Sequence, residues 1–243
     1  MEIIQFKNLL KYQNIMEHGI TCRGLDFMHK DINSSEFIAN RKKLAKELKI
    51  EEKDVFFINQ VHGKNLRMID ETSTNEILEY DGLITNCSGK VLVTCYADCV
   101  PLLFFDPIQK VIASVHSGWK GTIAEIGKNT VETMKKEYNS NPKDILACIG
   151  PSIGPCCFEV SKDVWEKFNQ KFPTSTLVES KVDLWQANKE QLIKAGIEEN
   201  NIEISKICTS CNNDKFYSYR KGDKERGRFT AYIMLRMFLQ KVY

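Results

Sequence analysis

The sequence predicts an α/β fold in which mixed, largely antiparallel sheets are flanked by helices. Apolar runs of strand length outnumber the segments with helical periodicity, and several follow one another with no helix between them. A doubly wound parallel sheet would require a helix between successive strands, so it is disfavoured. No repeat, low-complexity tract or Pro/Gly/Ser-rich linker divides the 243 residues. We therefore expect one domain over residues 1–243.

Three segments combine an N-terminal capping residue with apolar side chains at helical spacing. These predicted helices are residues 34–49, 122–138 and 183–195. The second opens with Thr122 and Glu125 in the spacing of a capping box, and Gly196 follows the third as a helix-ending residue.

Short apolar runs bounded by turn residues predict the strands. The first residues also alternate polar and apolar groups, which predicts an edge strand there. The other expected strands are Val55–Ile58, Leu66–Ile69, Gly82–Thr85, Lys90–Tyr96, Leu102–Phe105, Val111–Val115, Ile145–Ile149 and Ile202–Ile207.

The composition indicates an ordinary soluble globular protein. Hydrophobic residues make up 42% and charged residues 27% of the chain, and the net charge of +2 is too small to indicate nucleic acid or an acidic membrane as a partner. No run of about eighteen apolar residues is present, and the N-terminal residues lack the apolar core of a signal peptide. Nine cysteines, an odd number, fit reduced thiols in the cytoplasm. The oligomeric state is left open.

A hairpin is expected to bring Cys99 and His116 together. Asp106 and Pro107 suit a tight turn between two apolar strands. If Pro107 and Ile108 form the loop, Cys99 and His116 are directly opposed, with Cβ atoms about 4.5–5.5 Å apart. That distance suits a shared metal ion or a thiolate–imidazolium pair. A bulge that shifted the register by one residue would instead send one of the two to the other face.

A second histidine would complete a metal site. His62 follows an apolar run and precedes a glycine, where its side chain can point into a cleft. A lone histidine is usually structural, so His62 is a candidate ligand only because Cys99 and His116 are expected to lie together. Together His62, Cys99 and His116 give three protein ligands and one open position, which is typical of a catalytic zinc.

The other clustered cysteines are not expected to bind metal. Cys208 and Cys211 form a C-x-x-C pair, but a zinc ribbon needs a second spaced pair. Cys156 and Cys157 are adjacent, and neighbouring residues of an extended chain point to opposite sides.

The turn after His116 has features of an anion site. Gly118, Lys120 and Gly121 precede a predicted helix, whose free N–H groups and dipole favour negative charge. The alternative is that the glycines only allow the chain to turn.

Taken together, these motifs resemble those of a known family. They include NQVHGKNL (59–66), ADCVPLLFFDP (97–107), VHSGWKGT (115–122), IGPSIGPCCFEV (149–160) and CTSC followed by FYSYR and GRFTAYI (208–233). The chain is similar to the YfiH-like laccase-domain proteins, first called multicopper polyphenol oxidases and later identified as purine nucleoside-processing enzymes.

The resemblance carries several expectations. It implies a fold similar to bacterial toxin-type cysteine deamidases and places metal ligands on His62, Cys99 and His116. It also implies that Arg23 binds substrate. The family often has a threonine–arginine pair followed by glycines at this place. Here Cys22 stands between Thr21 and Arg23, and the glycine-rich tail is replaced.

Three activities are considered for this site. The first is metal-dependent phosphorolysis of adenosine, inosine or methylthioadenosine, with Arg23, Lys120, Gly118 and Gly121 as candidate phosphate-binding residues. The second is hydrolytic deamination of adenosine at the same metal, with Asp98 as a candidate carboxylate for proton transfer. The third is a metal-free hydrolase with Cys99 as nucleophile and His116 as base, linked by the resemblance to editing of peptidoglycan precursors. A non-enzymatic binding module would need a closed, four-ligand metal site instead.

The metal is expected to be zinc, with copper as the alternative. Copper outcompetes zinc at most nitrogen and sulfur ligands. The number of histidines excludes a multicopper laccase mechanism, because four histidines cannot supply both a blue-copper site and a trinuclear cluster.

Overall fold

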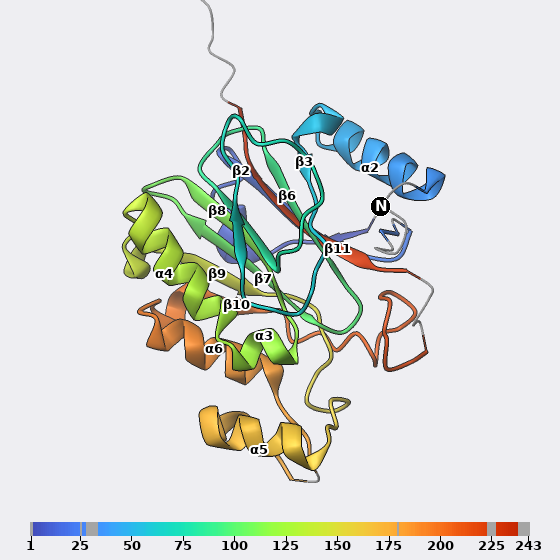
Figure 1. The fold of residues 1–243 in the computed structure, drawn as a ribbon, viewed down its shortest axis with the longest axis vertical. Helices are drawn as coiled ribbons and strands as arrows, with labels where there is room; N and C mark the ends of the chain where they lie inside the picture. The colour runs from blue at the N-terminus through green and yellow to red at the C-terminus, as the bar shows by residue number, and fades with distance from the viewer. Residues whose placement is uncertain (1, 25, 28–33, 179, 223–226, 238–243) are drawn as a thin grey trace, which may run out of the picture.

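The computed structural model describes residues 2–24, 26–27, 34–178, 180–222 and 227–237. Two mixed β-sheets lie face to face, with helices covering their outer faces (Figure 1). Antiparallel pairs occupy the middle of each sheet, and parallel pairs join β3, β4 and β10 at its edges. The predicted mixed α/β class is confirmed.

The first sheet has five strands in the order β1-β2-β11-β6-β3. β1 is the expected edge strand, whereas the central strands β2 and β11 were not predicted. β11 pairs antiparallel with both β2 and β6. The bounds are β1 Ile3–Ile4, β2 Met16–Thr21, β3 Val55–Phe56, β6 Val91–Tyr96 and β11 Phe229–Leu235.

The second sheet has six strands in the order β10-β9-β7-β8-β5-β4. All six fall within or close to predicted strands, since their apolar runs are well bounded. The bounds are β4 Leu66–Met68, β5 Gly82–Thr85, β7 Val100–Asp106, β8 Val111–Ser117, β9 Leu146–Ile149 and β10 Ile202–Ile204.

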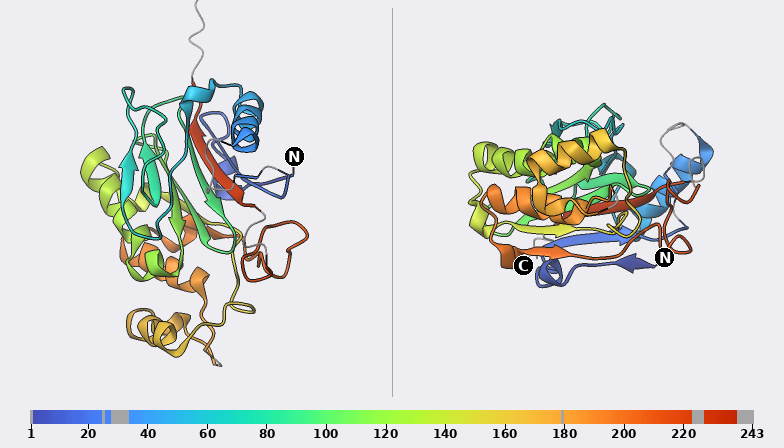
Figure 2. Two further views of the ribbon diagram at one scale, coloured as in Figure 1. Left: turned by 45° about the vertical axis from the view of Figure 1, so that its right-hand side comes forward. Right: turned by 90° about the horizontal axis from the view of Figure 1, so that it is seen from below.

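Helices cover both outer faces. α3, α4 and α6 lie against the six-stranded sheet, α5 lies below them, and α2 lies beside the five-stranded sheet (Figures 1 and 2). The short α1 joins β1 to β2. The bounds are α1 Lys7–Leu10, α2 Ser35–Glu47, α3 Trp119–Ile123, α4 Ile126–Tyr138, α5 Lys162–Lys171 and α6 Leu184–Lys194.

The predicted helix at 122–138 is wrong at its start. The chain forms the separate helix α3 first, and Glu125 then takes a left-handed conformation with φ of 57° before α4 begins. No side-chain capping bond is made by Glu125, and the Thr122 hydroxyl donates back to Gly118 O. A capping box needs an extended N-cap residue, and Thr122 is helical here.

Three apolar clusters separate the layers. One lies between the six-stranded sheet and its helices, one between the two sheets, and one between the five-stranded sheet and α2. β7 shows the alternation, because Leu102 and Phe104 face the helices while Leu103 and Phe105 face the other sheet. Burial on both faces explains why these strands are continuous apolar runs.

Two connections cross from the five-stranded to the six-stranded sheet. The first runs from β3 to β4 and carries His62, and the second runs from β6 to β7 and carries Cys99. On β8, alternate residues place His116 on the side that faces the inter-sheet layer, where its ring lies 5.6 Å from that of Tyr96. The fold therefore gathers these side chains at one end of that layer.

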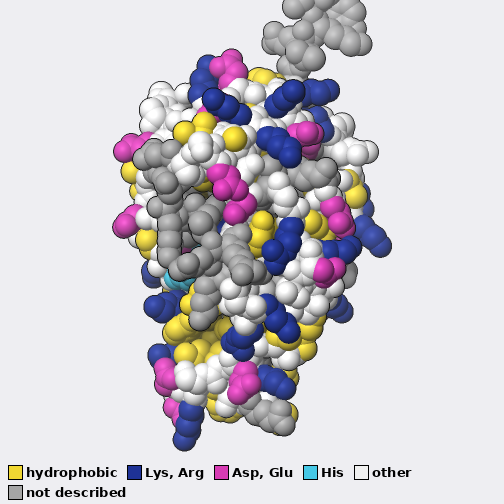
Figure 3. Space-filling view, turned by 90° about the vertical axis from the view of Figure 1, so that its right-hand side faces the viewer, with side chains coloured by type: hydrophobic (Ala, Val, Ile, Leu, Met, Phe, Trp, Pro, Cys, Tyr) yellow, Lys and Arg dark blue, Asp and Glu magenta, His cyan; other side chains and the backbone are white. Residues whose placement is uncertain are grey.

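The surface is mixed in charge. On the face in Figure 3, Lys and Arg side chains are interspersed with Asp and Glu side chains. Among the helices formed by the described residues, none is long and apolar enough to cross a membrane.

Candidate metal centre

The structure brings His62, Cys99 and His116 together. One ligand atom of each lies within 4.8 Å of the others. The His62 Nε2 atom is 4.0 Å from Cys99 Sγ, and the two imidazole rings stand nearly perpendicular with centroids 4.8 Å apart. His116 is buried, Cys99 is half-buried and His62 is exposed, so the cluster opens to solvent on the His62 side.

The predicted register of the Cys99 hairpin is wrong by two residues. His116 lies opposite Pro101, and Val100 lies opposite Ser117. The loop is longer than predicted because the ladder stops at Asp106 and Val111, and Lys110 takes φ of 52°. Side chains alternate with a period of two, so this error leaves Cys99 and His116 near each other as diagonal neighbours.

Asp81, which was not predicted as a site residue, positions both histidines. The His116 Nδ1 atom lies 2.9 Å from Asp81 Oδ1, and the backbone N–H groups of His62 and Gly63 donate to the same carboxylate. Asp81 is fully buried. Its position directly before the strand β5, in the motif Asp81-Gly82, was the available sequence clue. A carboxylate that orients a ligand histidine is a common partner in metal sites.

The backbone at His62 is shaped by the same carboxylate. His62 takes φ of 61°, in the left-handed region that non-glycine residues seldom adopt. Two consecutive N–H groups, of His62 and Gly63, turn toward Asp81 as a result. The buried carboxylate stabilises this conformation and aims the His62 ring at Cys99.

Gly118 leaves the space that the cluster needs. A Cβ atom at this position would lie 3.0 Å from His62 Cδ2 and 3.2 Å from Cys99 Sγ. Its φ of −68° is open to any residue, so the glycine is explained by space and not by backbone freedom. Two imidazoles, one thiol, a buried orienting carboxylate and this cradle fit a metal ion with an open coordination position.

Charge within the cluster favours a thiolate. Burial by itself raises the pKa of Cys99, but the charge and hydrogen bonds of His116 and His62 outweigh it and lower the pKa to about 6. Burial likewise lowers the pKa of His116, and the facing thiolate and Asp81 raise it to about 9. A thiolate is the form of cysteine that binds metal or attacks as a nucleophile.

Asp98 does not face the cluster. Its carboxylate accepts hydrogen bonds from Thr209 Oγ1 at 2.7 Å, Ser218 Oγ at 3.0 Å and the Arg220 backbone N–H at 2.8 Å. The residue is buried with φ of 85°. Both oxygens are occupied, so its suggested part in proton transfer for deamination is wrong.

The other predicted substrate-binding residues lie around the cluster's rim or farther along the chain. Lys120 is exposed on α3, two residues after Gly118. A Cβ atom at Gly121 would lie 3.1 Å from Gly63 O, so Gly121 allows α3 to pack against the His62 loop. The Arg23 guanidinium stacks on Tyr217 at 4.3 Å and donates to Asn213 O.

A buried polar network fixes the turn that contains Gly118. Ser117 Oγ lies 2.9 Å from both Thr122 Oγ1 and Asn188 Oδ1, and the Asn188 amide donates to Leu184 O. Asn188 belongs to α6, so this network ties the start of α3 to a neighbouring helix. Fully satisfied buried polar groups of this kind rigidify the segment that they join.

A second cluster of side chains was also missed. The sulfur atoms of Cys156, Cys157, Cys208 and Cys211 all lie within 4.8 Å of one another. In an extended chain Cys156 and Cys157 would point to opposite sides, as predicted. The chain instead turns there, since the N–H groups of Cys157 and Phe158 both donate to Gly154 O.

Comparison with known proteins agrees with the fold and shows the family. The model of a family described as multi-copper polyphenol oxidoreductase laccase matches residues 24–236. A protein named purine nucleoside phosphorylase from Clostridium acetobutylicum is 35% identical over 215 residues, with 87% of each chain covered. One of the same name from Bacteroides thetaiotaomicron is 37% identical over 163 residues, which span 64% of this chain and 60% of that protein.

Solved structures show the same architecture. The hypothetical protein YfiH of Bacillus licheniformis has a TM-score of 0.88 at 29% identity, and the match covers 96% of both chains. YlmD of Geobacillus stearothermophilus has a TM-score of 0.84 at 28% identity, with 91% of this chain and 92% of that chain covered.

Proposed function

We propose that this chain, which belongs to the multi-copper polyphenol oxidoreductase laccase family, is a metal-dependent purine nucleoside phosphorylase. The observation that carries the proposal is the open cluster of His62, Cys99 and His116, oriented by Asp81. The relatives named purine nucleoside phosphorylase support an enzyme of this type. Adenosine, inosine and methylthioadenosine are the proposed substrates, together with inorganic phosphate.

Each residue of the site has a distinct proposed role in binding metal, nucleoside or phosphate. Asp81 accepts a hydrogen bond from the Nδ1–H group of His116, so the Nε2 atom of His116 faces Cys99 and the open position. His62, on the solvent side, is placed to meet a nucleoside that enters. Lys120 and the Gly118–Gly121 turn supply positive charge and N–H donors for phosphate, and Arg23 is proposed to bind substrate. A bound zinc or copper ion would act as a Lewis acid that polarises the substrate.

The decisive experiment is a product assay with and without phosphate. Adenosine or inosine is incubated with the protein, and free purine, ribose 1-phosphate and ammonia are measured by mass spectrometry. We expect phosphate to be consumed in proportion to the purine released, with some inosine formed from adenosine. Equal purine release without phosphate would indicate a hydrolase, and ammonia without free purine would indicate a deaminase alone.

Cys99→Ala tests the role of the cluster. Loss of the thiolate ligand should remove the metal held there and nearly all activity, while the melting temperature changes little because an open site adds little to a core of this size. Cys87→Ala is the matched control, since Cys87 is a half-buried thiol that belongs neither to the His62–Cys99–His116 cluster nor to the four-cysteine cluster. A large fall in melting temperature with metal retained at this cluster would make Cys99 structural.

Lys120→Ala tests the phosphate site. The variant should raise the KM for phosphate more than the KM for the nucleoside, because the exposed ammonium is proposed to meet the anion. Equal changes in both constants would remove Lys120 from phosphate binding.

A thiol hydrolase is the second candidate, favoured by one observation. Asp81, His116 and Cys99 form a carboxylate–imidazole–thiol sequence, the arrangement that activates a cysteine nucleophile. Such an enzyme, for example one that edits peptidoglycan precursors, would keep its activity after treatment with a chelator. The phosphorylase should lose activity under the same treatment.

A further inference from the structure

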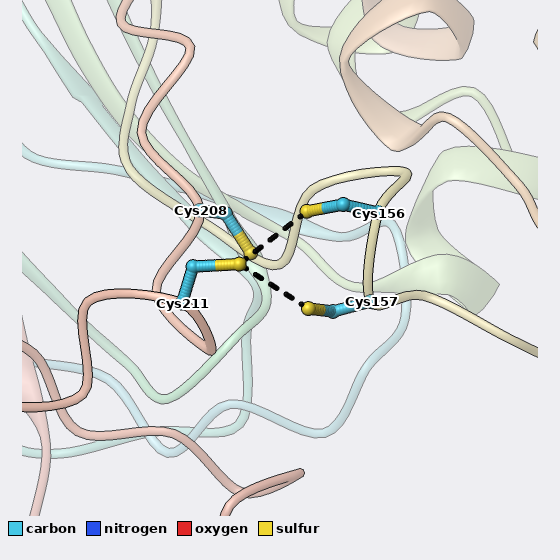
Figure 4. A group of neighbouring side chains, drawn as sticks. All are labelled: Cys156, Cys157, Cys208 and Cys211. Atoms are coloured by element: carbon cyan, nitrogen blue, oxygen red, sulfur yellow. Dashed lines mark hydrogen bonds between the residues drawn. The ribbon is translucent and has the colours of Figure 1, made fainter.

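We propose that Cys156, Cys157, Cys208 and Cys211 bind a structural zinc ion, separate from the metal centre at Cys99. All four sulfur atoms lie within 4.8 Å of one another, and Figure 4 shows them converging from two separate segments of the chain. The nine cysteines are free thiols in the structure, and these four form the larger of its two metal-capable groups among the described residues.

The spacing of the sulfur atoms fits one tetrahedral ion. Cys211 Sγ lies 3.6 Å from Cys156 Sγ and 3.5 Å from Cys157 Sγ. With Zn–S bonds of about 2.3 Å, the sulfur atoms of a regular tetrahedron are about 3.8 Å apart. An iron–sulfur cluster would place the thiolates on different iron atoms and so spread them farther apart. Four thiolates around a single point fit one tetrahedral ion such as zinc better than a multinuclear cluster.

The surroundings also suit a charged thiolate site. The backbone N–H of Gly154 donates to Cys208 Sγ at 3.2 Å. The Arg220 guanidinium donates to the backbone carbonyls of Cys157 and Glu159, which places a positive charge beside the cysteine turn. N–H donors and a nearby cation stabilise the negative charge that four thiolates bring to a metal.

The proposed ion would join the two segments that hold Asp98. Thr209, next to Cys208, and Ile153, in the segment before Cys156, both donate to Asp98. Asp98 precedes Cys99, so the zinc would stabilise the backbone from which the Cys99 ligand projects. This gives the site a structural role, in keeping with four protein ligands and no open position.

Metal analysis of single and double variants tests the proposal. Mass spectrometry and elemental analysis of the zinc-loaded protein should find about two ions per chain, falling to about one in Cys99→Ala, which keeps only the four-cysteine site. Adding Cys211→Ser to that variant should remove the remaining ion. Cys87→Ser is the control and should keep the full content.

A cobalt spectrum identifies the ligands without any activity assay. Cobalt-loaded Cys99→Ala should show the intense absorption of tetrahedral cobalt with four thiolates, and Cys156→Ser should weaken it. Because this readout uses a protein without the Cys99 ligand, it is independent of the proposed phosphorylase function. The Cys156 variant also serves where Cys211→Ser does not fold, since it removes a ligand from the other of the two segments.

Two results would overturn the proposal. One is a Cys99→Ala protein that holds no metal and whose four thiols react at once with a thiol reagent after zinc loading. The other is an intact mass lower by two or four hydrogens under native conditions, which would make the cluster a set of disulfides.

Discussion

The single side chain of Asp81 positions two of the three residues of the metal centre. One buried carboxylate accepts hydrogen bonds from the His116 ring and from the backbone of His62 and Gly63, so it sets a rotamer and a loop conformation together. The His116 backbone N–H also donates to Asp81 O at 2.7 Å. The two histidines are therefore positioned from the same point.

Asp81→Asn should weaken metal binding at His62, Cys99 and His116 by about 10- to 100-fold. The amide has one donor end, and either orientation sets that donor against an N–H group of Gly63, His62 or His116. Competition with a chelator measures the affinity. Asp70→Asn is the control, since Asp70 is exposed and bonds only Thr72 and Ser73 among the described contacts. An unchanged affinity would show that Asp81 does not position the ligands.

Gly118→Ala should impair the metal site without destabilising the fold. The new methyl group would meet His62 and Cys99 at 3.0 and 3.2 Å, and the ligands must move apart to admit it. The backbone angles suit alanine, so the melting temperature should change little while metal content and activity fall. Retained metal with normal activity would mean that the cradle is roomier than the geometry indicates.

The sequence could predict part of this site and not the rest. Cys99 and His116 follow from one hairpin, because the two strands are close in sequence and the period of two tolerates the register error. His62 gained meaning only from that pair. Asp81 reaches His116 through the pairing of β5 with β8, and that long-range contact has no local pattern in the sequence.

At the scale of the elements, α6 begins and ends where its local capping residues predict. Its N-cap Asp183 accepts hydrogen bonds from the N–H groups of Trp185 and Gln186, as the capping pattern predicts. Gly196 follows with φ of 101°, a conformation that favours glycine.

Asp183→Ala should lower the free energy of unfolding by about 1 kcal/mol, because two helix N–H groups lose their acceptor. Chemical denaturation measures the change. Ser161→Ala is the matched control, since Ser161 caps α5 without accepting a hydrogen bond from a helix N–H group. Equal effects of the two substitutions would contradict the capping explanation.

Other elements depend on tertiary contacts that no local pattern carries. β2 has the sequence MEHGIT, whose polar residues and glycine hide a strand that is fixed by β11 through long-range pairing. The break between α3 and α4 arises where Glu125 turns left-handed, although the residues on both sides favour helix. The cysteine turn at Gly154–Phe158 likewise could not be predicted from a local pattern.

At the scale of the whole molecule, stability should depend on pH through His18. Its ring is buried against Phe6, and Nε2 accepts the Phe6 backbone N–H at 2.8 Å. Burial lowers the pKa of His18 from 6.5 to about 4. Between these values the unfolded chain binds a proton that the folded chain does not, so stability falls as the pH is lowered from 6.5 to 4.

The full effect of His18 is about 3 kcal/mol at pH 4 or below. His18→Gln keeps an acceptor for Phe6 and removes the titration. Urea denaturation of both proteins between pH 7 and pH 4 should show a smaller loss of stability in the variant. Parallel pH curves for the two proteins would exclude His18 as a source of acid sensitivity.

The layered arrangement follows from the composition of the strands. A run such as VPLLFFD is buried on both faces, so it contains no polar alternation to show which sheet the strand joins. Fold class could therefore be predicted from the number and order of elements. The assignment of strands to two sheets could not.

The central place of β11 has a consequence for biosynthesis. β11 lies between β2 and β6, yet the ribosome makes it after every other strand of that sheet. A growing chain can form the Cys99 hairpin early, while the facing edges of β2 and β6 stay open until residues 229–235 emerge. Open strand edges pair readily with other chains. Until β11 pairs with both strands, the edges of β2 and β6 are the places where the nascent protein can pair with another chain.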